Sequence, residues 1–135
     1  MDETKHSQVY IAVVDDEIDL LCLFKDALTQ IDGIEVFTFS DPHMALEHFR
    51  LNYHKYGAVV SDYRMPLMNG IQMFDKMKTI NPAVARILVS AFEVKDDVFN
   101  GCGCVDKFLQ KPISIIDLID EVEASLRIIA FQKTY

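Results

Sequence analysis

The chain has 135 residues, half of them hydrophobic, and carries a formal net charge of −8 at pH 7. This length suits one domain with its own core, and the apolar content argues against disorder beyond the ends. The acidic charge disfavours a nucleic-acid or anionic membrane surface, because both need a basic footprint, and no apolar run is long enough to span a bilayer.

Residues 1–8 form a polar N-terminal tail that lacks the apolar segment of a signal peptide. The three cysteines, Cys22, Cys102 and Cys104, are an odd number and indicate reduced thiols. We therefore expect a cytoplasmic protein with one domain over residues 9–131 and no effector domain.

In the first half of the chain, apolar runs of strand and helix type alternate. Residues 9–14 read as a buried strand, and the helical spacing of apolar residues from Leu20 to Ile31 predicts a helix that stops at Gly33. Residues 34–39 alternate in polarity, which predicts a strand that has one less-covered face or lies at an edge. Asp41 and Pro42 then form a helix start, and residues 52–57 read as a loop leading into the next strand.

The second half repeats the pattern. The apolar run 58–60 predicts a buried strand that ends at Asp62, and helical spacing predicts a helix over 71–77 that ends before Pro82. Strands are expected at 86–89 and 107–110, with a short helix at 94–100 between them and a final helix capped at Ser114.

Five strands that alternate with five helices predict an α/β fold with a doubly wound parallel sheet in a three-layer sandwich. The flavodoxin-like strand order 2-1-3-4-5 would place the first and third strands side by side.

Acidic residues follow both of these central strands. Asp15 and Asp16 come after the first strand, and Asp62 ends the third. If the strands are neighbours, the carboxylates converge and repel each other unless a cation lies between them. Such a small set of oxygen ligands suits Mg²⁺. The alternative for Asp15 and Asp16 is capping of the next helix, which is compatible with a metal role.

Two more strand ends carry groups that suit a phosphoryl oxygen. Ser90 ends the fourth strand and supplies a neutral donor, and Lys111, before Pro112, follows the fifth and supplies a cation. Taken singly, Lys111 reads as a surface lysine and Ser90 as a helix cap. Together with the acids, they agree in chemistry at four strand ends.

In their order and spacing, these residues resemble the receiver domain of two-component response regulators, from Val9 to the last helix. The resemblance includes Pro66 and Gly70, four and eight residues after Asp62. It implies a stand-alone, chemotaxis-type receiver that accepts a phosphoryl group on Asp62 from a sensor histidine kinase or a phosphotransfer protein.

The resemblance also implies roles for the other site residues. Asp16, Asp62 and the backbone carbonyl of Arg64 would hold Mg²⁺, and Asp15 would act mainly through water. Lys111 would pair with the phosphoryl group, while Ser90 would hydrogen-bond it in the active state. Such a domain catalyses only its own phosphorylation and dephosphorylation, so it is not a turnover enzyme.

Rival functions use the same fold. An aspartyl-nucleophile phosphohydrolase typically needs a second acid two residues after the nucleophile, where this chain has Arg64. A flavin or nucleotide carrier would need a Gly-rich loop after the first strand, where this chain has Asp15 and Asp16. A phosphate sink or scaffold receiver without a dedicated target is the remaining alternative.

Gating and output are assigned to further residues. Arg64 and Phe92 are expected to flank the mouth of the site and to gate water and the phosphodonor. Phe108 lies three residues before Lys111, where the resemblance implies an aromatic that moves inward when Ser90 closes on the phosphoryl group, and the alternative is an ordinary strand aromatic. A target protein would then contact the face formed by the helix at 94–100, the strand at 107–110 and the final helix, and the candidate contacts are Lys95, Phe99, Lys107 and Ile115.

Overall fold

A computed structural model describes the backbone of residues 8–91 and 103–134 and the side chains up to residue 127. The helix expected at 94–100, together with Phe92, Lys95 and Phe99, lies outside these residues. In chain order the elements are β1 (Val9–Val14), α1 (Ile18–Leu28), β2 (Ile34–Phe39), α2 (Pro42–Asn52), the 3₁₀ turn η2 (Tyr53–Lys55), β3 (Tyr56–Asp62), α3 (Gly70–Ile80), β4 (Ala85–Ser90), β5 (Lys107–Gln110) and α5 (Ile115–Thr134).

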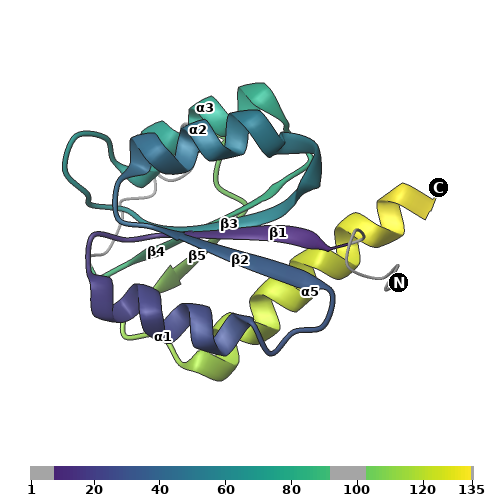
Figure 1. Ribbon diagram of the computed structural model, residues 1–135, viewed down its shortest axis with the longest axis horizontal. Coiled ribbons are helices and arrows are strands. Elements are labelled where there is room, and N and C mark those ends of the chain that lie inside the picture. The colour runs from purple at the N-terminus through teal and green to yellow at the C-terminus, as the bar shows by residue number, and fades with distance from the viewer. Residues whose placement is uncertain (1–7, 92–102, 135) are drawn as a thin grey trace, which may run out of the picture.

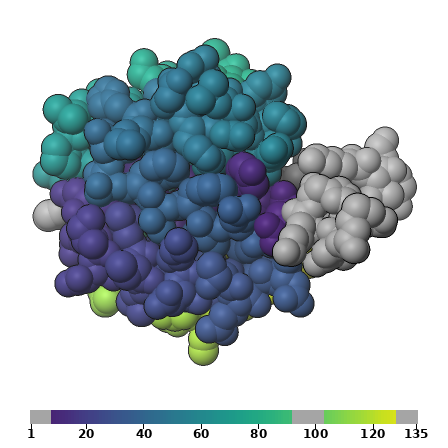
Figure 2. Space-filling view, in the orientation of Figure 1, coloured from purple at the N-terminus to yellow at the C-terminus, as the bar shows by residue number. Residues whose placement is uncertain are grey.

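The sheet has five parallel strands in the order β2-β1-β3-β4-β5, which confirms the predicted fold. Helices α2 and α3 cover one face, and α1 and α5 cover the other (Figure 1). Figure 2 shows side chains of α1 and α2 on either side of the edge strand β2. The carboxyl ends of all five strands meet at one edge, on the left in Figure 1.

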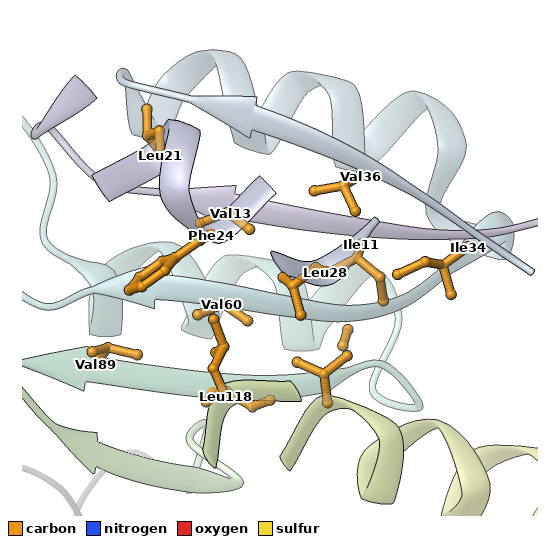
Figure 3. Packing of buried hydrophobic residues seen from close by; sticks show 13 residues of the cluster. Ile11, Val13, Leu21, Phe24, Leu28, Ile34, Val36, Val60, Val89 and Leu118 are labelled. Atoms are coloured by element: carbon orange, nitrogen blue, oxygen red, sulfur yellow. The ribbon is translucent and has the colours of Figure 1, made fainter. Parts of the chain in front are cut away.

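Each face of the sheet packs its own core, because successive side chains of a strand point to opposite faces. In β3, Ala58 and Val60 pack with α1 and α5, whereas Tyr56 and Val59 pack with α2 and α3. Figure 3 shows the first of these clusters, where Phe24 from α1 and Leu118 from α5 close over the strands. Both sheet faces being buried explains the continuous apolar run that precedes Asp62.

Side chains fix the helix starts. Asp41 Oδ1 accepts a hydrogen bond from the His43 backbone N–H at 2.8 Å, which confirms the predicted cap of α2. Helix α3 begins with a capping box that the sequence analysis did not identify: Asn69 Oδ1 accepts from the Gln72 N–H at 2.8 Å, and Gln72 Oε1 accepts from the Asn69 N–H at 2.9 Å.

Two details differ from expectation. Residues 53–55, expected within a loop, form the 3₁₀ turn η2, and Tyr56 is already the first residue of β3 with its ring buried. The expectation of reduced thiols holds for Cys22, which is free, but is wrong for Cys104, which is disulfide-bonded. None of the helices in the described part of the chain has the length and apolar composition needed to cross a membrane.

Candidate functional site

The acidic residues converge because β1 and β3 are neighbours. Val14 of β1 pairs with Ser61 of β3. The residues that follow them, Asp15 and Asp62, therefore lie at the same edge of the sheet. Asp15, Asp16 and Asp62 each offer a carboxylate oxygen, and these oxygens all lie within 4.8 Å of one another. The structure thus brings together the three acids that the sequence predicted, although Asp16 is exposed and the Asp15 side chain is buried.

Lys111, which follows the edge strand β5, also contacts these acids. Its Nζ donates to Asp15 Oδ2 at 2.9 Å and lies 3.5 Å from Asp62 Oδ1. Only 12% of the lysine side chain and 11% of the Asp62 side chain are exposed, so water screens this ion pair weakly. Glu17, which the sequence analysis did not assign to the site, contributes a carboxylate oxygen 3.7 Å from the same Nζ. Its position beside the acidic pair is the only sequence signal for that role.

Burial and like charge shift the pKa values of the acids. Burial, followed by repulsion from Asp15, raises the pKa of Asp62 to about 6, although Lys111 opposes the shift. Burial also raises the pKa of Asp15, against the hydrogen bonds from the Glu17 N–H and Lys111. Burial lowers the pKa of Lys111, but its interactions with Asp15, Asp62 and Glu17 outweigh burial, so the net pKa is raised. The lysine therefore stays charged among acids that are costly to ionise.

The backbone after Asp62 is held by short contacts. The Tyr63 N–H donates to the Val89 carbonyl at 3.1 Å, and the Gly70 N–H donates to the Tyr63 carbonyl at 2.8 Å. Ser61 Oγ donates to the Asp62 carbonyl at 2.9 Å. A Cβ at Gly70 would collide with the Asp62 carbonyl oxygen, which explains why glycine stands at this position. Ser61 and Gly70 thus support the loop that presents Asp62.

The remaining predicted site residues lie around this cluster. Ser90 ends β4, is almost fully buried, and its carbonyl accepts from the Lys111 N–H at 2.7 Å. Phe108 is half-buried in β5 and packs against the cluster on the α2–α3 side. Arg64 is exposed in the loop after Asp62. The gating partner expected at Phe92 lies outside the described residues.

The donor set fits a hard divalent cation. All three acids supply oxygen, the ligand atom that Mg²⁺ prefers, and one or two carboxylates are the usual protein share of its shell. The pKa of Asp62 is raised by burial first and by repulsion from Asp15 second, and a cation between the two carboxylates would offset that repulsion. The cluster could therefore bind a metal ion.

Comparison with known proteins agrees with this geometry. The family profile described as "Response regulator receiver domain" matches residues 11–123. Transcriptional regulatory protein PrrA of Mycobacterium tuberculosis is 30% identical over 118 residues, which are 87% of this chain and 49% of PrrA. Transcriptional regulatory protein GlrR of Escherichia coli is 30% identical over 122 residues, which are 90% of this chain and 27% of GlrR. The chain thus spans half or less of the length of these two relatives.

Solved structures show the same fold. A response regulator receiver domain protein from Clostridium thermocellum superposes with a TM-score of 0.78 at 27% identity, and the match covers 92% of this chain and 98% of that one. A CheY-like receiver domain protein from Methanospirillum hungatei reaches a TM-score of 0.85 at 22% identity, with 93% and 99% covered.

Proposed function

This chain belongs to the response regulator receiver domain family, and we propose that Asp62 is its phosphoryl acceptor. The observation that carries the proposal is the placement of Lys111 between Asp15 and Asp62, with Asp16 beside them, at the carboxyl edge of the sheet. The Asp62 carboxylate therefore lies beside the Lys111 ammonium group, which can pair with the oxygens of a phosphoryl group.

In the proposed reaction, an oxygen of the ionised Asp62 carboxylate attacks the phosphorus of a phosphohistidine. The bond between phosphorus and the imidazole nitrogen breaks, the electron pair leaves with the imidazole, and an acyl phosphate forms on Asp62. Lys111 neutralises charge on the phosphoryl oxygens, and Ser90 donates a hydrogen bond to one of them in the phosphorylated state. Water later hydrolyses the acyl phosphate, so the domain acts only on itself.

The metal assignment follows the same residues. Asp16, Asp62 and the Arg64 carbonyl would hold Mg²⁺, with Asp15 acting mainly through water. The ion would supply positive charge for the phosphoryl oxygens. Without it, ionised Asp15 and Asp62 repel each other, and this repulsion is the reason we assign a divalent cation here.

Chemistry separates this function from its rivals. An aspartyl phosphohydrolase would need a general acid at position 64, where an exposed arginine stands. A nucleotide carrier would need donors for phosphate after β1, where Asp15 and Asp16 present negative charge instead. A scaffold that takes no phosphoryl group is disfavoured, since the ends of β1, β3, β4 and β5 all carry side chains that the proposed reaction requires.

For partners, we propose a sensor histidine kinase or phosphotransfer protein as donor, in the cytoplasm, and a protein target. A recess of about 410 Å³ beside Lys111, with apolar side chains of α1 and Ile113 on its walls, gives a donor protein room to dock. The target would contact the face of β5 and α5 near Phe108, where Lys107 is half-exposed and pairs with Glu121 at 3.7 Å. The net charge of −8 favours a protein over a nucleic acid as the immediate contact.

Intact mass after incubation with Mg²⁺ and a small phosphodonor such as acetyl phosphate tests the proposal. We expect the parent to gain the mass of one phosphoryl group, and Asp62→Asn to gain none, because an amide cannot attack phosphorus. Asp75→Asn is the matched control, since Asp75 is exposed on α3. Equal labelling of the Asp62→Asn variant, or of the parent in excess chelator, would show that the acceptor or the metal is wrongly assigned.

Amide exchange mapping with and without the phosphodonor tests the output face. We expect changes in β5 and the first turns of α5. Changes confined to α1 and α2, with β5 silent, would mean that the signal leaves by another surface.

A further inference from the structure

Strand β5 must place Lys111 accurately, yet it has few means of fixing its own register. It has only four residues, at the edge of the sheet beside β4. From there Lys111 reaches past β4 to Asp62 on β3 and to Asp15 after β1, and each strand spacing is about 4.8 Å. A shift of one residue would turn the lysine to the opposite face of the sheet.

The hydrophobic pattern of β5 specifies this register weakly. Phe108 packs against the cluster on the α2–α3 side, and Leu109 packs against the cluster on the α1–α5 side. A one-residue slip would still leave a large apolar side chain on each face. Burial alone therefore discriminates little between the two registers, and another interaction has to select one.

Asp106 and Arg86 form a reciprocal contact at the start of β5. The Asp106 N–H donates to the Arg86 carbonyl at 2.9 Å, and the Arg86 N–H donates to Asp106 Oδ2 at 2.7 Å. The contact thus starts the ladder in which Lys107 pairs with Ile87 and Gln110 with Ser90. At the other end, the Lys111 N–H donates to the Ser90 carbonyl.

The Arg86 side chain holds the same segment from inside the protein. Only 3% of Arg86 is exposed. Its Nε donates to the Cys104 carbonyl at 2.7 Å, its Nη1 donates to the Val84 carbonyl at 2.8 Å, and its Nη2 lies 3.7 Å from Asp106 Oδ2. A buried guanidinium is stable only with such partners, so this geometry ties residues 104–106 to the start of β4.

We propose that Arg86 and Asp106 are positioning residues that fix the β4–β5 register and so set the reach of Lys111 to Asp62. They touch no site group, since they lie at the opposite end of β4 from Ser90. Their effect on phosphoryl transfer passes through the backbone of β5, and this part of the inference rests on the proposed function. Asp15, Asp16 and Asp62 come from other strand ends, so loss of this pair leaves the three acids in place.

The test compares Asp106→Ala, which removes the acceptor for the Arg86 N–H, with Asp106→Asn, which keeps an acceptor oxygen. Asp41→Ala is the matched control, because that carboxylate also accepts from one backbone N–H but caps α2, away from β5. For each folded variant, three quantities are measured: amide exchange of Lys111 by NMR, the Mg²⁺ dissociation constant, and the phosphorylation rate with acetyl phosphate at saturating Mg²⁺.

We expect Asp106→Ala to speed exchange of the Lys111 amide and to slow phosphorylation by roughly tenfold, because a displacement of about 1 Å of a positioned group has effects of this order or larger. Its Mg²⁺ dissociation constant should not rise above that of the parent, because the three acids stay in place and a displaced Lys111 competes less with the ion. Asp106→Asn and Asp41→Ala should phosphorylate like the parent. Parental exchange and rate in Asp106→Ala would overturn the inference, as would loss of Mg²⁺ affinity in parallel with the rate. If the parent takes no phosphoryl group, the proposed function fails, and the Lys111 amide exchange alone decides the register inference.

Discussion

Replacing Asp62 with Asn should stabilise the metal-free protein above neutral pH. Asp62 has its pKa raised from 3.8 to about 6 by burial and by the Asp15 carboxylate. The folded state therefore holds this proton more tightly than the unfolded state does. Below about pH 4, Asp62 is protonated in both states and does not change the free energy of unfolding. Its ionisation lowers this free energy increasingly between about pH 4 and 6, and by the full amount above about pH 6.

The size of the effect follows from the shift. A pKa raised from 3.8 to about 6 corresponds to about 3 kcal/mol at high pH, since each tenfold change in proton affinity is worth about 1.36 kcal/mol. The Asp62 side chain is only 11% exposed, so solvent screening removes little of this cost. For a domain of this size the gain should raise Tm by about 10 °C.

Urea unfolding of the parent and of Asp62→Asn in chelator, at about pH 4 and about pH 8, measures the difference in the free energy of unfolding. Asp32→Asn is the control, because it removes the same formal charge from an exposed loop position. We expect stabilisation only at the higher pH and only in Asp62→Asn. Equal stabilities at the higher pH, or a gain of the same size at both, would refute electrostatic strain at this carboxylate. Mg²⁺ should then stabilise the parent but not the variant.

Three further outcomes are expected. Lys111→Met should lower the phosphorylation rate with acetyl phosphate by about 100-fold, because an electrostatic stabiliser is lost, and an unchanged rate would remove Lys111 from the mechanism. Gly70→Ala should lower the free energy of unfolding by about 1–3 kcal/mol, because the added methyl meets the Asp62 carbonyl oxygen and Leu88, and a parental melting curve would contradict this. Shortening Arg64 and Phe92 together to Ala should change the decay rate of the phosphorylated protein more than its Tm, and equal decay rates would dismiss the gate.

The sequence determined the layout because local signals are sufficient for it. Apolar runs that stop at an acid placed Asp62 and Asp15 at strand ends, and the alternating run 34–39 predicted β2 as a strand with one less-covered face or at an edge. The Asn69–Gln72 capping box is equally local and could have been predicted from its spacing. The acidic cluster followed once the strand order put β1 beside β3, since parallel strands end at one edge.

Only the tertiary structure decided the interactions that join distant parts of the chain. That Lys111 contacts Asp15 depends on the order and twist of four strands, and no periodicity near residue 111 encodes it. That Arg86 is buried depends on the carbonyl of Cys104 and the carboxylate of Asp106 in the segment before β5, because a guanidinium without partners would remain in water. Local patterns report which face of an element is buried, whereas the pairing of charges is set by the assembled sheet.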